Sequence, residues 1–281
     1  MDIDDLRRRI DEIDEKILTL LNERYEHVKE IGHWKTKRDH AIYVPEREKK
    51  VLTRLEKLNT GPLTPKALRA IYREIMSGAL ALESAFVVAC PGNECALAKL
   101  ATLEKFGRNV KCASNKSTKQ VFDDVIAKRA AYGVVPVEHS KEGVLNETLD
   151  LLRESPLRIC SEIYANSQSE AEGGIEDVTR FIVLGRQNPK PTGDDKTSIC
   201  LSLGNRAGSL CEAFIPFKER NIQITMLESR PSRDKEWEYL FFMDFTGHAD
   251  VEPVKGAIEE LRNAALDLRL LGSYPRADDV I

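Results

Sequence analysis

An apolar stripe with a helical period runs through the first 37 residues, and it constrains the fold more than any other feature. Apolar side chains recur at steps of three and four residues, as in an amphipathic helix. They are Leu6, Ile10, Ile13, Ile17, Leu20, Leu21, Val28 and Ile31. The stripe predicts one long helix over residues 2–37. Prolines at the starts of the next two periodic segments predict further helices from 45 to 58 and from 65 onward.

Three helices in about 85 residues give a small core, so we expect the long helix to pair with a second copy of the chain.

Cations also interrupt the stripe. Arg24 lies on its apolar face, and Lys35 returns to within roughly 20° of the same line about 16 Å further along. Such charges are costly unless an anion lies nearby. Spacing alone leaves open a buried ion pair, snorkelling side chains or an anion-binding site.

Arg7 stands seventeen residues before Arg24, about 25 Å away and roughly 100° round the helix. One small ligand therefore cannot contact both side chains on the same helix. If Arg7 also binds ligand, it serves the site of a partner subunit.

The period changes after Ser84. Short apolar segments alternate with helical ones over residues 86–186, which predicts an α/β region with a parallel or mixed sheet. Residues 187–195 form a Pro/Gly-rich linker. Residues 196–281 follow a βαββαβ order, which is ferredoxin-like. We thus predict a multidomain α plus α/β protein with domains at 1–85, 86–186 and 196–281.

Composition limits the class of partner and the compartment. The formal net charge is −4 and no long basic run occurs, which argues against nucleic acid. No apolar run is long enough to cross a bilayer, and the polar N-terminus lacks a signal-peptide core. None of the six cysteines forms a CxxC pair or a zinc motif. We expect buried free thiols, no metal, no cofactor and a cytoplasmic location.

Several short motifs in the first 84 residues fall in order at the spacing of a known family. They are LRRRIDEID at 6–14, NER at 22–24, IGHWK at 31–35, VPERE at 44–48 and YREIMS at 72–77, followed by Glu83. This segment resembles the all-helical chorismate mutases, which are intertwined dimers that rearrange chorismate to prephenate.

The resemblance implies a set of site residues. They are Arg7 acting from a partner subunit, Arg24 and Arg47 as ligands of the carboxylates, Lys35 and Glu83 beside the ether oxygen, and Glu48 as acceptor for the hydroxyl. An ionised Glu83 would repel the ether oxygen, so we expect it protonated in the working site, with activity favoured at acidic to neutral pH. Val44 and Ala79 depart from the family, where some members carry an acidic residue and a serine.

The C-terminal segment resembles ACT regulatory domains of the phenylalanine-sensing kind. The motifs are NRAGSL at 205–210, ESRP at 228–231 and LGSYP at 271–275. A glycine at a helix N-terminus permits close backbone approach and favours a carboxylate. The effector-binding residues that the resemblance implies are Asn205, Ala207, Gly208, Ser209, Leu210, Glu228, Ser229 and Arg230.

The middle segment resembles prephenate dehydratase, but only in part. YGVVPVEHS at 132–140 matches one family motif, with His139 in place of asparagine, and DVTRF at 177–181 matches the catalytic strand. The segment from 162 to 176 is far too short for the second lobe that closes over prephenate, so water would not be excluded. The residues of this degenerate site are Glu138, Ser140, Thr179, Arg180 and Phe181.

In this order the three segments resemble the P-protein family, chorismate mutase–prephenate dehydratase. We predict a chorismate mutase that is a homodimer or higher oligomer, is modulated by phenylalanine and has lost dehydratase activity. Three alternatives stay open: an enzyme that is still bifunctional, a non-catalytic phenylalanine sensor of a partner enzyme, and a mutase for a substituted chorismate.

Overall fold

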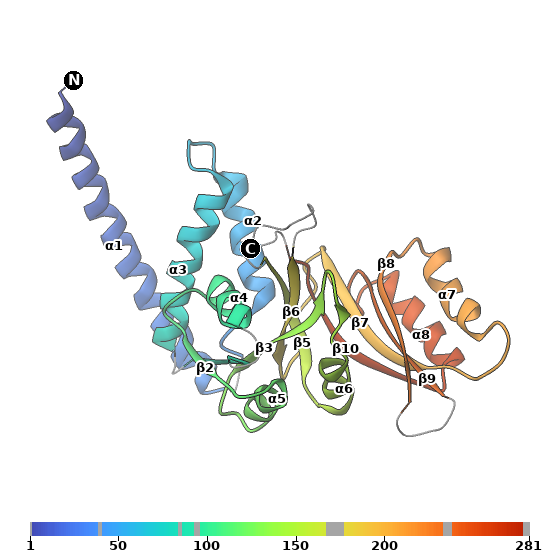
Figure 1. Ribbon diagram of the computed structural model, residues 1–281. Coiled ribbons are helices and arrows are strands. Elements are labelled where there is room, and N and C mark those ends of the chain that lie inside the picture. Colours follow the sequence, from blue (N-terminus) through green and yellow to red (C-terminus); the bar gives the residue numbers. More distant parts are fainter. Residues whose placement is uncertain are drawn as a thin grey trace.

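The computed structural model describes residues 2–38, 41–83, 86–92, 96–166, 177–232 and 238–277 (Figure 1). It begins with a helical region made of α1 (Ile3–Thr36), α2 (Pro45–Leu58) and α3 (Pro65–Glu83), which confirms the three predicted helices. Pro45 and Pro65 stand at the first helical positions, where a missing N–H costs nothing. The Thr64 hydroxyl accepts a hydrogen bond from the Ala67 N–H at 3.2 Å and caps α3.

Helix α1 packs on α3 only through its C-terminal half, and its N-terminal half extends away from the rest of the chain (Figure 1). The Tyr25 hydroxyl donates to the Ile75 carbonyl at 3.0 Å. Gly78 makes room for this contact, since an added Cβ there would lie 2.5 Å from the Tyr25 hydroxyl. Further toward the N-terminus the stripe is uncovered in a single chain: Ile10 is 57% exposed and Ile17 49%.

The middle lobe is the α/β region that follows. Its elements are β1 (Val87–Cys90), α4 (Ala96–Phe106), β2 (Lys111–Ser114), α5 (Thr118–Ile126), β3 (Tyr132–His139), β4 (Gly143–Val144), α6 (Asn146–Glu154), β5 (Arg158–Asn166) and β6 (Val178–Gly185). The strand order is β2-β1-β3-β6-β5, with β4 beside β3. Strand β1 runs parallel to β2 and β3, whereas β6 runs antiparallel to β3 and β5, so the sheet is mixed.

One local prediction was wrong in this lobe. The alternating pattern of the sequence predicts a helix over residues 143–154, whereas α6 begins at Asn146. Gly143 and Val144 instead pair with His139 and Glu138 as a short antiparallel strand. The turn requires Gly143 at φ +80°, a left-handed conformation that glycine adopts without strain.

The C-terminal domain has the predicted βαββαβ order. Its elements are β7 (Asp195–Ser202), α7 (Ser209–Glu219), β8 (Ile224–Pro231), β9 (Tyr239–Thr246), α8 (Val254–Ala264) and β10 (Asp267–Pro275). The sheet order β10-β7-β9-β8 is antiparallel throughout, which is the ferredoxin-like arrangement. Helices α7 and α8 bury one face of the sheet, with Phe217, Phe245 and Leu261 in the core between them.

The opposite face of this sheet packs on the middle lobe, with β10 against β5 (Figure 1). Leu271 and Tyr274 share one buried core with Ile159 and Ile182. The approach is closest at Gly272, where an added Cβ would lie 2.4 Å from the Ile159 carbonyl oxygen. Because that atom belongs to the backbone, only glycine fits here.

The cysteines are more varied than expected. Cys90, Cys160 and Cys200 are buried, Cys112 is half-buried, and Cys211 is exposed on the outer helix α7. The expectation of buried thiols was therefore wrong for Cys211, and Cys95 lies outside the described residues. Among the helices of the described segments, none combines the length and apolar character that a membrane span needs.

Candidate active site

A cavity of about 320 Å³, the helical cavity, opens between the three N-terminal helices and the end of α4. Its volume is at the lower end of the range for small-molecule sites. Five residues predicted from the sequence line it: Arg24, Lys35, Arg47, Glu48 and Glu83. Arg7 is not among the lining residues. It is exposed on the free half of α1 and pairs with Asp4 at 3.2 Å.

Arg24 brings a guanidinium group with an unsatisfied nitrogen to this cavity. Its Nη1 atom is buried and has no hydrogen-bond partner among the described residues. A buried guanidinium nitrogen without an acceptor is costly, and an anionic ligand would remove that cost.

Lys35 and Glu83 face each other across the cavity from α1 and α3. The Lys35 ammonium donates to Glu83 Oε2 at 2.8 Å and to the Ile42 carbonyl at 2.7 Å. The two side chains are 17% and 8% exposed. Gly32 allows α1 to approach Glu83, since an added Cβ would lie 3.1 Å from Glu83 Cγ and 3.2 Å from its Cα.

The first turn of α2 supplies Arg47 and Glu48. Glu48 Oε2 accepts a hydrogen bond from the Tyr43 hydroxyl at 2.6 Å and lies 3.5 Å from the Lys105 ammonium. Burial, and next the Glu48 carboxylate, raise the pKa of Tyr43 well above its usual value, so the phenol stays a donor. Val44 and Ala79 line the cavity with apolar side chains.

Sequence reasoning missed Tyr43, Arg73 and Lys105 as cavity residues. Arg73 is hydrogen-bonded to Glu104, since its Nη1 donates to the Glu104 carboxylate at 2.5 Å and to the Glu104 carbonyl at 3.1 Å. Lys105 belongs to a different part of the chain, and no periodicity in the sequence indicates that α4 reaches the helices.

A second cavity, of about 160 Å³, lies on the C-terminal domain where the loop after β7 enters α7. Three of the residues that the sequence places at an effector site, Asn205, Ser209 and Leu210, line it. Ala207 and Gly208 lie in the same loop, and Gly208 caps α7 at φ +89°.

The other predicted effector residues are not among the described residues that line this cavity. Glu228, Ser229 and Arg230 lie on β8, which is an edge strand of its sheet. Arg230 reaches the middle lobe, where it contacts Asp150 Oδ1 at 2.6 Å and the Asn146 carbonyl at 2.7 Å.

Known families match all three parts of the chain. The chorismate mutase type II family matches residues 6–84, the prephenate dehydratase family 88–170 and the ACT domain family 198–263. The bifunctional chorismate mutase/prephenate dehydratase of Aquifex aeolicus is 34% identical, over 98% of this chain and 98% of its own. The chain belongs to the bifunctional chorismate mutase/prephenate dehydratase family. Its helical region is a chorismate mutase domain, and its C-terminal domain is an ACT domain.

Solved structures of prephenate dehydratases share the fold of the rest of the chain. The enzyme of Streptococcus mutans matches with a TM-score of 0.59 and 29% identity, over 68% of this chain and 98% of its own. The enzyme of Arthrobacter aurescens matches with a TM-score of 0.60 and 21% identity, over 68% and 90%. The middle lobe therefore has a prephenate dehydratase fold, in shortened form.

The alignment with the Aquifex aeolicus protein measures how much is missing. It runs over 356 positions, and this chain has 281 residues, so at least 75 positions (356 − 281) have no counterpart here. This agrees with a dehydratase domain that has lost a lobe.

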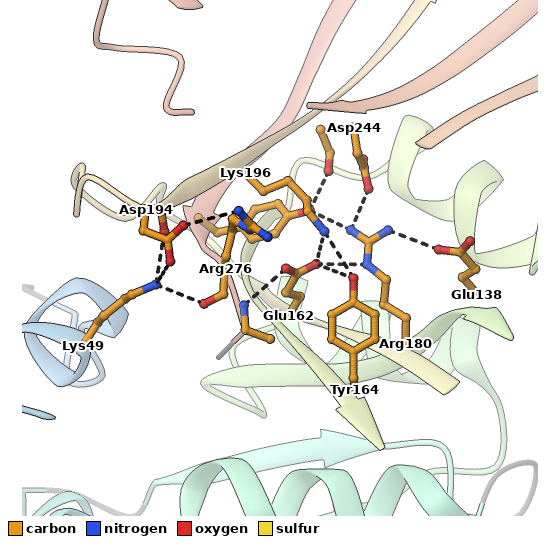
Figure 2. Close-up of polar contacts among 12 residues, drawn as sticks. Lys49, Glu138, Glu162, Tyr164, Arg180, Asp194, Lys196, Asp244 and Arg276 are labelled. Atoms are coloured by element: carbon orange, nitrogen blue, oxygen red, sulfur yellow. Dashed lines mark hydrogen bonds and ion pairs between the residues drawn. The ribbon is translucent and has the colours of Figure 1, made fainter. Parts of the chain in front are cut away.

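In this family member two of the predicted dehydratase residues, Arg180 and Glu138, lie at a junction with the ACT domain (Figure 2). Arg180 is 5% exposed, and its guanidinium donates to Glu162 Oε2 at 3.0 Å and to the Tyr274 hydroxyl at 3.0 Å. It also pairs with Asp244 Oδ2 at 2.6 Å and Glu138 Oε2 at 3.4 Å. The cavity that reaches Arg180 has a volume of about 10 Å³, about the room for one water.

The remaining members of this set are also held by the fold. Thr179 is buried opposite His139 in the sheet, and Phe181 is fully buried in the core. The Ser140 hydroxyl accepts from the Val178 N–H at 3.1 Å. His139 Nε2 lies 2.7 Å from the Asp177 carboxylate. Within the described segments, no three His, Cys, Asp or Glu side chains gather in a way that would hold a metal.

Proposed function

We propose that this chain converts chorismate to prephenate in the helical cavity, and that it no longer dehydrates prephenate. The observation that carries the proposal is the buried Nη1 of Arg24, which has no hydrogen-bond partner in the described part of the chain and lies in the same cavity as Lys35 and Arg47. Chorismate is a dicarboxylate with an ether oxygen and a hydroxyl. Arg24 and Arg47 would bind the carboxylates, and Glu48 would accept from the hydroxyl.

The rearrangement is pericyclic, so the protein needs no covalent nucleophile. Its task is to hold the compact conformer and to stabilise the charge that develops on the ether oxygen. Lys35 and Glu83 lie 2.8 Å apart, and the ether oxygen would enter between them and accept from both. Glu83→Gln keeps a hydrogen-bonding group beside Lys35 and can donate an N–H to the ether oxygen, so we expect it to retain more activity than Glu83→Ala. Equal losses in the two variants would contradict this role.

The position of Arg7 supports a site shared between two subunits. The half of α1 that carries Arg7 extends from the molecule with its apolar stripe exposed (Figure 1). A second copy would cover that stripe and bring its Arg7 to the helical cavity of the first. The test mixes Arg7→Gln protein with Arg24→Gln protein, each strongly impaired alone. Random mixing makes half of the dimers mixed, and one site in each is intact, so about a quarter of wild-type activity should return.

The junction at Arg180 supports the loss of dehydratase activity. Its charge is neutralised by Glu162 and Asp244, so it offers nothing to an anionic substrate. The lobe that would exclude water is missing, and the adjoining cavity has room for about one water at about 10 Å³.

Phenylalanine is proposed as the effector at the cavity lined by Asn205, Ser209 and Leu210. The Arthrobacter aurescens dehydratase, which shares the fold, was solved in complex with L-Phe. Lys49, one residue after Glu48, connects the mutase domain to the ACT domain. Its ammonium donates to Asp194 Oδ2 at 2.7 Å, just before β7, and to the Arg276 carbonyl at 3.2 Å, just after β10 (Figure 2). Regulation requires phenylalanine to bind two mutase states with different affinity.

The names of the relatives favour a second candidate, an enzyme that remains bifunctional. A phenylalanine sensor without catalysis and a mutase for a substituted chorismate are the remaining alternatives. Val44 and Ala79 line the cavity with apolar side chains where some family members carry polar ones, and this favours a mutase for a substituted chorismate.

One assay separates these candidates. Purified protein is given chorismate, and prephenate and phenylpyruvate are followed separately with and without phenylalanine. We expect prephenate alone. Phenylpyruvate would establish the bifunctional enzyme, and no turnover of chorismate would favour the sensor or the substituted substrate. Arg24→Gln should lower kcat/KM by about 10- to 100-fold, because a hydrogen bond to a charged ligand is lost. Arg54→Gln, an exposed arginine on α2, is the control and should leave it unchanged.

A further inference from the structure

The end of α4 belongs to the middle lobe, yet its last two residues line the helical cavity. They are Lys105 and Phe106. The match to the mutase family ends at residue 84, so these side chains lie outside the domain that carries the other cavity residues. The cavity is therefore walled by two domains rather than by helices α1 to α3 alone.

Lys105 and Tyr43 hold the same oxygen of Glu48. The Tyr43 hydroxyl donates to Oε2 at 2.6 Å, and the Lys105 ammonium lies 3.5 Å from that atom. Neither contact falls on Oε1. The carboxylate is thus fixed in orientation through one oxygen, and the other can accept from a ligand hydroxyl.

The middle lobe also fixes Tyr43 itself. The Tyr43 ring meets Phe106 edge-on at 4.9 Å between centroids and Tyr132 at 5.3 Å. The Tyr132 hydroxyl donates to the Tyr43 carbonyl at 2.9 Å. Such edge-on aromatic contacts restrict the orientation of a buried ring. Both groups that hold Glu48 therefore depend on the middle lobe.

Charge gives a second reason for Lys105. An isolated carboxylate in the cavity would repel a ligand that carries two carboxylates. The Lys105 ammonium offsets the charge of Glu48, and the Glu48 and Lys105 side chains are only 16% and 23% exposed, so solvent screens the pair incompletely. The site can then keep an acceptor for the hydroxyl without losing attraction for the carboxylates.

We propose that the middle lobe completes the mutase site: Lys105, together with Tyr43, is a positioning residue that sets Glu48 for the substrate hydroxyl. This inference rests on the proposed mutase activity. It assigns the shortened lobe a role in the mutase reaction in place of dehydration, because without the lobe Glu48 would lose Lys105, and Tyr43 would lose its contacts with Phe106 and Tyr132.

The test measures kcat and KM for chorismate with the full-length protein. Lys105→Met should lower kcat/KM by about three- to tenfold, as expected for a partly buried ion pair. Tyr43→Phe removes one hydroxyl and should lower it about tenfold or more. Lys105→Arg keeps the charge and should retain most activity. Lys99→Met removes an exposed charge from the same helix and should have no effect.

The decisive comparison adds Glu48→Gln. If Lys105 acts through Glu48, Lys105→Met should have no further effect in the Glu48→Gln background. Equal losses in both backgrounds, or full activity of Lys105→Met, would overturn the inference while wild-type turnover leaves the mutase function intact. Circular dichroism of each variant checks folding, and an inactive wild type would instead defeat the proposed function itself.

Discussion

The buried ion pair between Arg180 and Asp244 allows a sharp test of how the middle lobe is joined to the ACT domain. The charged atoms lie 2.6 Å apart, and the side chains are 5% and 3% exposed. Glu162 and Lys196 form a second pair beside them at 2.7 Å. Two cations and two anions thus balance in a buried space. Asp244→Leu leaves two cations against one buried carboxylate, with only the more exposed Glu138 as a further anion at 3.4 Å, and breaking such a buried pair costs about 3–5 kcal/mol.

Arg180→Met breaks the same pair from the other side and should cost a similar amount. If the two losses were independent, the double variant would be about 6–10 kcal/mol less stable than wild type. In the double variant, however, Glu162 and Lys196 still balance. We therefore expect it to lose no more than one single variant does, a coupling of about 3 kcal/mol.

Equilibrium urea unfolding followed by circular dichroism measures these differences, with Asp250→Asn as control. Asp250 is 74% exposed, and its change should stay within about 0.5 kcal/mol. The reasoning fails if either single variant lies within about 1 kcal/mol of wild type, or if the losses simply add.

Three further results are expected. Gly32→Ala should lower kcat/KM for chorismate by about tenfold with the fold intact, because its Cβ would lie 3.1–3.3 Å from Glu83 and displace it; an unchanged rate would argue against tight positioning. A hydrogen bond from Cys90 lowers the pKa of Cys112 to about 7, so alkylation of Cys112 by iodoacetamide, followed by peptide mass spectrometry, should be half-maximal near pH 7 rather than pH 9. Burial raises the pKa of Cys160 from about 9 to about 12, so the stability present below pH 9 should be lost as pH rises toward 12. Cys160→Ala should make the urea midpoint less sensitive over that range, and an unchanged slope would contradict the assignment.

Local patterns predict the elements of this chain well. The three-and-four spacing on residues 2–37 predicts α1, and the same spacing places Arg24 and Lys35 on one line that does face the cavity. The βαββαβ order of the ACT domain follows from alternation alone. Each of these features depends on residues that are close in the sequence.

Contacts between domains were not predictable in this way. Lys105 meets Glu48 across 57 positions, and Arg230 meets Asp150 across 80. Nothing in the local pattern around a lysine at a helix end distinguishes a solvated side chain from one that enters a neighbouring domain's cavity. The burial of Arg180 was unpredictable for the same reason, because it depends on where the ACT sheet packs on the middle lobe.

The pairing of β5 with β6 bears on how a whole lobe could be lost without unfolding the rest. These strands are antiparallel neighbours, and eleven residues join Asn166 to Val178. If the 75 or more positions that the relatives add lie in this connection, as the sequence predicts, their loss shortens a hairpin loop about eightfold. Three halvings of loop length lower the free-energy cost of closing the loop by about 2 kcal/mol. The deletion would then have made the remaining hairpin easier to close, a gain in chain entropy to set against the lost contacts.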